Sequence, residues 1–299
     1  MNITIHRGAN QIGGCITEIA TTTTKIFIDF GNNLPGSQKT ELTANEVAQM
    51  TIDADAIFYT HYHGDHVGLH HLIPECVAQY MGAGAIDVMR CKYEALNAHQ
   101  DFSQQLAATE RMIPFKEREH IVVNNSIIVT PFFVSHSAFD AYMFLIECEG
   151  KRILHTGDFR RHGYLGKGLF PTLKSYIGTV DLLIIEGTML GRQQEQVVTE
   201  HQIQLNTIQA LKEHKYIFAL CSSTDIDRLA SFHAACKATG RQFLMDSYQR
   251  KVLDVFTEYC GNKSSLYKFD HLFELQRNKP YRIEKITNYL KDKGFLMPV

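Results

Sequence analysis

His61, His63, Asp65 and His66 place four potential metal ligands within six consecutive positions of the chain. They follow the apolar run ADAIFYT (54–60), whose β-branched and aromatic residues are typical of a buried strand. Gly64 lets the loop turn tightly, so the ligands on either side of it can face one point. Imidazole nitrogens and a carboxylate oxygen suit zinc, and also manganese or iron. The segment therefore predicts a metal site at the end of a strand, with enough ligands for two neighbouring ions.

Three other predicted strands end in residues that suit the same site. His136 follows the predicted strand 126–135, Asp158 ends 152–158, and Asp29 lies near the end of 24–31. Ligands are commonly presented where strands end in loops, so we expect these side chains to meet the cluster at 61–66. Asp158 could bridge two ions through its two oxygens, and Asp29 could orient a ligating histidine by accepting its second N–H. Each residue alone also fits an ordinary turn or loop, and only their joint occurrence favours one metal centre.

The order of predicted elements divides the chain near residue 190. Strands are expected at 15–21, 24–31, 54–60, 126–135, 141–150, 152–158 and 180–188, with helices at 64–80 and 92–112. Helix then alternates with strand, at 199–215, 216–223, 225–240, 242–247 and from 249 onward. Such alternation implies parallel βαβ units. We therefore expect one domain over 1–190 and a second over 191–299.

Composition limits the environment and the partners. The formal net charge is −2, so binding to nucleic acid would need a local basic patch. Arg160 and Arg161 directly follow Asp158 and could hold backbone phosphates, although a solvated basic loop explains them equally well. The seven cysteines form no C-x-x-C pair, which favours reduced thiols in the cytoplasm over a thiolate zinc site. No segment has the length and apolar character of a signal peptide or a membrane span.

The ordered series Asp29, His61-x-His63-x-Asp65-His66, His136 and Asp158 resembles the motifs of the metallo-β-lactamase superfamily over about the first 190 residues. One departure is Leu69, which stands where that family often has a second glycine. The resemblance implies an αββα sandwich that binds two zinc ions, or manganese. By the same resemblance, His61, His63 and His136 hold one ion, Asp65 and His66 hold the other, and Asp158 bridges them.

Two further segments are similar to the β-CASP branch of this superfamily, which includes ribonuclease J. Glu186 ends the predicted strand 180–188, and 217–243 looks like the opening of a β-CASP cap. Glu186 alone fits a strand-end carboxylate equally well. The resemblance implies a partial α/β cap over 191–299, a supporting role for Glu186 behind the ligands, and hydrolysis of phosphodiesters in RNA rather than DNA. A metal-bound hydroxide would attack phosphorus, held and oriented by Asp65 and Asp158.

Two alternatives to a nuclease stay open. In the β-CASP branch the chain returns from the cap with further histidine motifs, and no such segment follows residue 200. The resemblance therefore implies a C-terminally truncated chain, or one completed by a second copy or by another chain. A small-molecule hydrolase would act on a thioester, lactone or cyclic phosphodiester and would have a closed pocket. A non-catalytic protein would bind one ion or none, together with nucleic acid or a partner.

Overall fold

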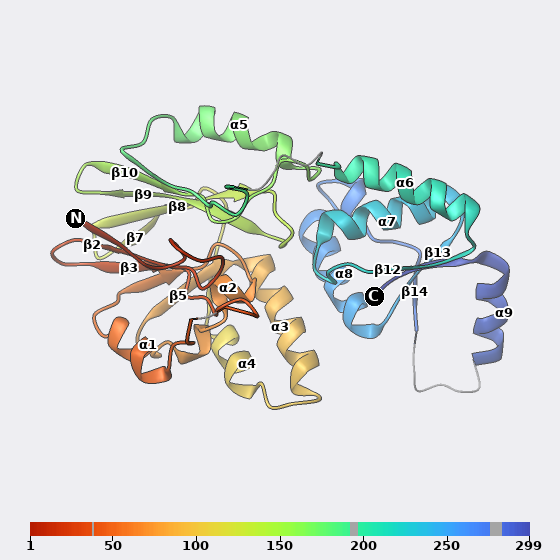
Figure 1. Ribbon diagram of the computed structural model, residues 1–299, viewed down its shortest axis with the longest axis horizontal. Coiled ribbons are helices and arrows are strands. Elements are labelled where there is room, and N and C mark those ends of the chain that lie inside the picture. The colour runs from red at the N-terminus through yellow and green to blue at the C-terminus, as the bar shows by residue number, and fades with distance from the viewer. Residues whose placement is uncertain (38, 192–196, 276–282) are drawn as a thin grey trace. The chain divides into compact units, whose positions relative to one another are not determined.

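The computed structural model describes residues 1–37, 39–191, 197–275 and 283–299, which form two compact units (Figure 1). The first unit is Met1–Arg160 with Gly168–Gln194, and the second is Arg161–Lys167 with Glu195–Val299. The first unit ends at Gln194, a few residues beyond the domain boundary expected near residue 190. The short segment 161–167 belongs to the second unit because of a long-range contact, in which Tyr164 Oη lies 3.0 Å from Ser231 Oγ. The local sequence does not predict this contact.

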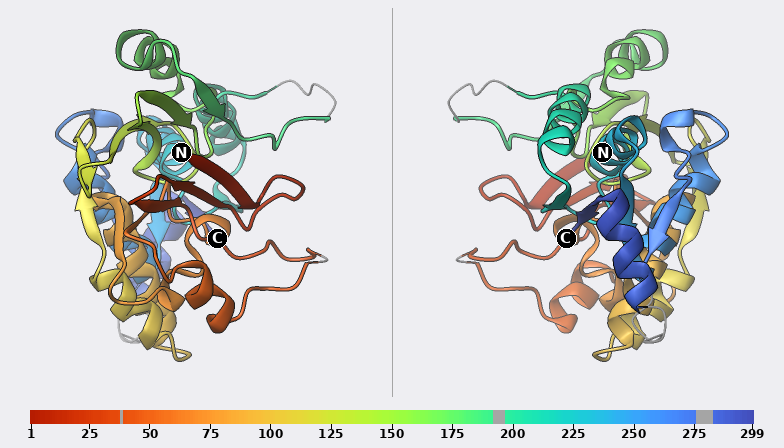
Figure 2. Two further views of the ribbon diagram at one scale, coloured as in Figure 1. Left: turned by 90° about the vertical axis from the view of Figure 1, so that its left-hand side faces the viewer. Right: turned by 90° about the vertical axis from the view of Figure 1, so that its right-hand side faces the viewer.

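The first unit has four layers, with two sheets between two layers of helices (Figure 1 and Figure 2). One sheet contains, in order, β1 (Asn2–Arg7), β2 (Ile16–Ala20), β3 (Lys25–Ile28), β4 (Ala56–Phe58), β5 (Ala78–Gly82) and β6 (Ile113–Phe115). The other contains β11 (Leu182–Ile184), β10 (Lys151–His155), β9 (Ala141–Cys148), β8 (Ile127–Val134) and β7 (Ile121–Val123). Helices α1 (Ala44–Met50), α3 (Ala83–Asn97) and α4 (Ser103–Glu110) lie on the first sheet, and α5 (Leu169–Thr172) lies on the second. The predicted αββα sandwich is confirmed.

The side chains of β9 pack alternately into two cores, one between the two sheets and one under α5. Phe144 and Ile146 pack into the core between the sheets, against residues such as Ile28 and Phe58. Met143 and Leu145 point the other way and pack against Ile177, which follows α5. Side chains in a strand point alternately to opposite faces, so an almost wholly apolar strand is what two covered faces require. Glu149 and Gly150, with φ of 49° and 71°, form the tight turn from β9 to β10.

Two helical predictions in the first unit are wrong in extent. In place of a helix over 64–80 the structure has the single turn α2 (Gly64–Val67), the 3₁₀ turn His70–Leu72 and then strand β5. Pro74 lacks the N–H that a continuing helix would need, and it separates the two patterns. The expected helix 92–112 is two helices, α3 and α4. Strands β1, β6 and β7 and helix α1 were not predicted, since most of them are short and partly exposed.

The second unit is a parallel sheet with the strand order β12 (Tyr216–Ala219), β15 (Phe295–Pro298), β13 (Gln242–Met245) and β14 (Leu272–Glu274). Helix α6 (Glu200–Glu213) precedes β12, and helices α7 (Ile226–Thr239), α8 (Ser247–Cys260) and α9 (Ile283–Lys293) lie one each between successive strands of the chain. Gly240, in the left-handed conformation at φ 66°, ends α7. The prediction of parallel βαβ units is confirmed. Among the described residues, no helix combines the length and apolar character needed to cross a membrane.

His70 is a fully buried histidine that links the first helical turns to α4. Its Nδ1 lies 3.0 Å from the Val67 carbonyl, and its Nε2 lies 3.1 Å from that of Gln105. Burial lowers the pKa of His70 to about 4. Because the unfolded chain binds a proton more readily, this histidine costs stability as the pH falls from about 6.5 toward 4.

We therefore expect His70→Gln to reduce the acid sensitivity of the metal-free protein. The free energy of unfolding of the wild type should fall by roughly 1–3 kcal/mol more than that of the variant between pH 6.5 and 4. Urea unfolding at several pH values measures this difference. Parallel pH profiles for the two proteins would contradict the assignment.

Candidate metal centre

Six side chains with nitrogen or oxygen donors meet in the first unit, and each comes from a segment that closely follows a strand. They are His61 and His63 after β4, Asp65 and His66 in α2, His136 after β8, and Asp158 after β10. Neighbouring members lie within 3.1–3.9 Å of one another. The structure therefore brings together the residues that the sequence assigned to one site.

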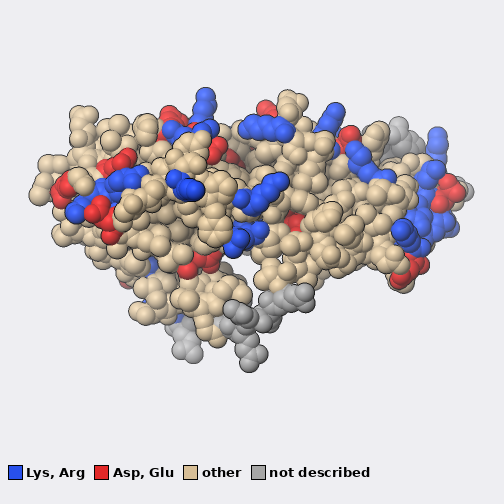
Figure 3. All heavy atoms as spheres, turned by 90° about the horizontal axis from the view of Figure 1, so that it is seen from above, with Lys and Arg blue, Asp and Glu red and all other residues tan. Residues whose placement is uncertain are grey.

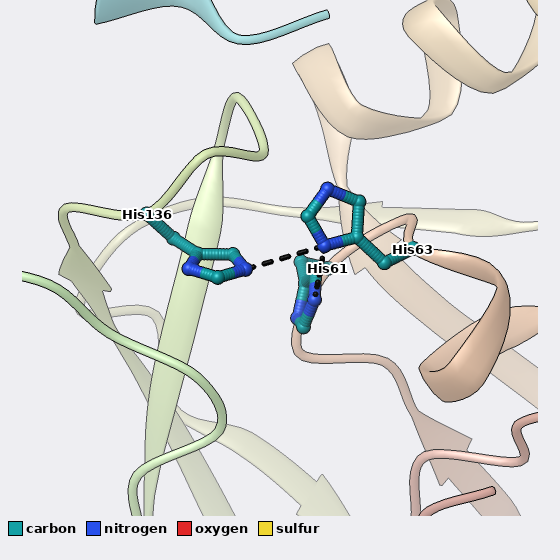
Figure 4. A group of neighbouring side chains, drawn as sticks. All are labelled: His61, His63 and His136. Atoms are coloured by element: carbon teal, nitrogen blue, oxygen red, sulfur yellow. Dashed lines mark hydrogen bonds between the residues drawn. The ribbon is translucent and has the colours of Figure 1, made fainter. Parts of the chain in front are cut away.

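His61, His63 and His136 form the tighter part of this set (Figure 4). The Nδ1 of His63 lies 3.1 Å from His61 Nε2 and 3.2 Å from His136 Nε2. Two nitrogens bound tetrahedrally to one zinc at about 2.05 Å are roughly 3.3 Å apart. The three rings are therefore spaced as ligands of a single ion would be.

His61, His66 and Asp158 form a second group whose donor atoms lie within 4.8 Å of one another. Asp158 reaches both groups, with Oδ1 at 3.5 Å from His66 Nε2 and Oδ2 at 3.9 Å from His136 Nε2. Asp65 Oδ2 lies 3.8 Å from His66 Nε2, although Asp65 is in neither group of the described residues. A carboxylate with one oxygen toward each group suits a bridge between two ions.

The histidines of the tighter group are held in the form that binds metals. Burial, reinforced by the neighbouring histidines, keeps the pKa of His61 well below its usual value, and burial also lowers the pKa values of His63 and His136. A neutral imidazole offers a free lone pair, whereas an imidazolium does not. These three histidines thus fit a divalent ion of the zinc type without first having to lose protons near neutral pH.

Asp29 orients His66 through a hydrogen bond to the ring nitrogen Nδ1. It is fully buried, and its Oδ2 lies 2.7 Å from His66 Nδ1, while its Oδ1 accepts the Thr60 N–H at 2.7 Å. Burial alone would lower the pKa of His66, but the charge of Asp29 and the hydrogen bonds to Asp158 and Asp29 raise it well above its usual value. With Nδ1 fixed in this way, Nε2 is turned toward Asp158.

Backbone contacts hold Asp65 and His66 against the end of β3. The Phe30 N–H donates to the His66 carbonyl at 2.7 Å, and the Asn32 N–H donates to that of Gly64 at 2.9 Å. A Cβ at Gly31 would lie only 1.7 Å from the Asp65 carbonyl oxygen. Glycine is therefore required where the two segments touch, which explains the sequence that follows Asp29.

The loop that carries His136 is fixed by two residues that sequence reasoning missed. Tyr62 Oη accepts the Phe139 N–H at 2.7 Å. Asp140 Oδ2 accepts the N–H groups of Gly84 and Ala85, at the start of α3, at 2.9 and 3.3 Å. An acidic cap at a helix N-terminus is favourable, but nothing in the local sequence pairs Asp140 with a helix more than 50 residues away.

We expect Tyr62→Phe to weaken metal binding at the three-histidine group by roughly 10–100-fold, as removal of a supporting hydrogen bond typically does. The reason is that the Phe139 N–H loses its buried acceptor and the His136 loop loosens. Competition titration with a zinc chelator measures the affinity. Tyr59→Phe is the matched control, because Tyr59 Oη bonds instead to Gln79 Oε1 at 2.7 Å. Equal affinities for both variants would contradict this role.

The outlying predicted residues fall in different places. Glu186 Oε1 accepts the N–H of Phe159 at 3.0 Å, which fixes the backbone next to Asp158. Arg160 lies in the first unit, and its charge helps to lower the pKa of His136, after burial and other neighbours. Arg161 belongs to the second unit. The phosphate contacts expected of the two arginines stay predictions.

A pocket of about 540 Å³ opens beside the second group, within the first unit. Asp65, His66 and Asp158 form one part of its wall. Other residues of the wall come from the N-terminal segment and the end of β11, among them Arg7, Gln11, Cys15, Ile185 and Glu186. Its volume is in the range of pockets that take small ligands.

Fold and site together define a metal-dependent hydrolase of the metallo-β-lactamase type. A family model described as "Beta-lactamase superfamily domain" matches residues 24–219, and the chain belongs to this family. That range includes Asp29, Asp158 and every histidine of the site.

A solved structure supports the fold alone. The crystal structure of a protein of unknown function from Enterococcus faecalis V583 matches with a TM-score of 0.75 and 17% sequence identity. The match covers 99% of this chain and 76% of that chain. No curated protein matches the sequence.

Proposed function

We propose that the protein hydrolyses phosphodiester bonds in RNA, as a nuclease similar to ribonuclease J. The observation that carries the proposal is the pair of ligand groups that share His61 and are linked by Asp158. Two divalent ions, zinc or manganese, would polarise a phosphoryl oxygen and acidify a water when bound there. A paired site of this kind is common among enzymes that transfer phosphoryl groups.

The side chains of the site would hold the ions and orient the attacking water. Three histidines and His66 would hold the ions, with Asp29 fixing His66 and Glu186 fixing the backbone after Asp158. Asp65 and Asp158 would orient the attacking water by accepting its hydrogen bonds. Asp65 and His66 both lie on the pocket wall. The side chain of Asp65 is the more exposed of the two and is therefore the more accessible to an incoming water.

Support for RNA is local rather than global. On the face drawn in Figure 3, Lys and Arg are interspersed with Asp and Glu, so phosphate contacts would come from individual residues such as Arg160. Arg161 is a second candidate for such a contact. The resemblance of 217–243 to a β-CASP cap, on a parallel α/β unit, supports the nuclease over other hydrolases of the superfamily.

The test uses protein reconstituted with zinc or manganese and 5′-labelled RNA and DNA of one sequence. We expect metal-dependent cleavage of RNA, slower cleavage of DNA, and none by Asp65→Ala. Cleavage that is unchanged in Asp65→Ala, or absent with both metals, would refute the proposal.

The pocket favours a second candidate, a small-molecule hydrolase acting on a thioester, lactone or cyclic phosphodiester. Assaying these substrates beside RNA separates the two functions. Metal content separates both from a non-catalytic protein that binds nucleic acid or a partner. Two equivalents favour an enzyme, and one or none favours binding alone.

A further inference from the structure

His155 is a buried histidine on the wall of the pocket whose lining also includes Asp65, His66 and Asp158. It is the last residue of β10, and only 8% of its surface is exposed. Among the described residues, His155 belongs to neither of the two ligand groups. The metal centre therefore does not account for this histidine.

The side chain of His155 points into the space between the two sheets. Ile153, two residues earlier on β10, packs into the core between the sheets, and alternate residues of a strand share a face. The residues in register with His155 on the two neighbouring strands are Phe144 and Ile184, and both pack in the same core. Ile184 also lies on the pocket wall. The imidazole therefore lies where the core between the sheets meets the pocket.

One ring nitrogen of His155 is held by the backbone, and the other is available to a ligand. The Gly157 N–H donates to His155 Nδ1 at 3.2 Å, so the proton of the neutral ring is on Nε2. Burial lowers the pKa of His155 to about 4, which keeps the ring neutral near pH 7. Within the described part of the chain, Nε2 forms no hydrogen bond, and it is not among the unpaired side-chain atoms that are shut off from solvent. His155 therefore offers one N–H donor that a molecule in the pocket can reach.

A neutral N–H donor suits the surroundings of a metal centre. A lysine, an arginine or a protonated histidine would be repelled by divalent ions held at Asp158, whereas a neutral imidazole is not. Asp158 follows His155 by only three residues, and its charge acts on the imidazole. A hydrogen bond from a neutral donor to a charged oxygen, such as that of a phosphate, is stronger than one between two neutral groups.

We propose that His155 donates its Nε2–H to an oxygen of the phosphate group that the substrate places in this pocket. The inference rests on the proposed function for its choice of a phosphate. It adds a substrate-binding residue that lies on the strand itself and holds no ion. The ring keeps the same proton in the free and the bound protein, so no change in its charge accompanies binding.

Two substitutions separate the two ring nitrogens. In His155→Gln the side-chain amide can replace the Nε2–H donor, but the acceptor for the Gly157 N–H is lost. In His155→Asn the side-chain oxygen can still accept the Gly157 N–H, but the amide group falls short of the position of Nε2. A role in binding phosphate therefore predicts that glutamine is the better replacement, and a purely structural role predicts that asparagine is.

The probe is inorganic phosphate, whose binding to the zinc-loaded proteins is measured by isothermal titration calorimetry. We expect His155→Asn to bind phosphate roughly 10–100-fold more weakly than the wild type, as the loss of a hydrogen bond to a charged group implies. His155→Gln should stay within a few-fold of the wild type. His120→Asn is the matched control, because His120 lies outside the pocket and its Nδ1 is 2.9 Å from Thr130 Oγ1.

Metal content and RNA cleavage are measured on the same proteins. Undiminished phosphate binding by His155→Asn, weaker binding by His155→Gln than by His155→Asn, or loss of metal from His155→Asn would assign His155 to holding the backbone at Gly157 and overturn the inference. Failure of the wild type to bind phosphate would also overturn it, and cleavage of RNA by the wild type would leave the proposed function standing in each of these cases. Phosphate binding as expected without cleavage of RNA would instead overturn the proposed function and support the donor role of His155.

Discussion

Replacing His61 and His63 together by alanine is expected to abolish hydrolysis, with a loss on the order of a thousandfold or more. The change removes two of the three nitrogens that surround one point in Figure 4. It also removes one donor from the second group, because His61 belongs to both. Neither group then keeps three donors from the set that the structure brings together.

Metal content and cleavage rate are the two measurements, and both should fall together. A double variant of two exposed histidines, His99→Ala with His201→Ala, controls for the loss of imidazoles in general. Circular dichroism of the metal-free proteins separates loss of the site from loss of the fold. A double variant at 61 and 63 that retains metal and full activity would show that the chemistry lies elsewhere.

The sequence predicted which side chains would meet, because their positions follow from strand ends. An apolar run such as 54–60 identifies a buried strand, and a polar residue just beyond it must leave the core. The same reasoning applies to His136 and Asp158, and the structure brings these residues together. Whether they hold metal stays a prediction.

The sequence could not predict the contacts that support those side chains. The hydrogen bonds of Tyr62 to the 136–140 loop and of Asp140 to α3 join segments far apart in the chain. The periodicity of apolar residues in a single sequence indicates whether a segment is helix or strand, but it does not indicate which distant segment packs against it. For the same reason the segment 161–167 was assigned to the first domain, although the contact of Tyr164 with Ser231 ties it to the second.

The predicted helix boundaries are wrong where the pattern of apolar residues is ambiguous. Val67, Leu69 and Leu72 fit a helical face, yet the chain leaves α2 after Val67 because Asp65 and His66 must stay pinned to β3. Here the tertiary contacts of the site override local propensity, as often happens at functional sites. Pro74 marks the break in the sequence, because it cannot donate a hydrogen bond to a continuing helix.

Asp29→Ala is expected to destabilise the metal-free protein by roughly 3–5 kcal/mol, the usual cost of removing one partner from a buried charged pair. His66 Nδ1 and the Thr60 N–H both lose their acceptor in a place that water does not reach. Alanine also fits poorly at φ 61°, the left-handed conformation that Asp29 adopts. Urea unfolding measures the loss.

Asp29→Asn separates the charge from the backbone. Asparagine tolerates a positive φ and keeps one oxygen for the Thr60 N–H, so it should restore much of the stability lost in Asp29→Ala. It cannot supply the negative charge that holds His66, so we expect the affinity for the second ion to remain roughly 10–100-fold below that of the wild type. Asp55→Asn is the control, because Asp55 accepts the Lys25 N–H at 2.8 Å and the amide of Asn124 at 2.7 Å. If Asp29→Asn binds the second ion as tightly as Asp55→Asn does, Asp29 is a turn residue and the orientation of His66 does not depend on its charge.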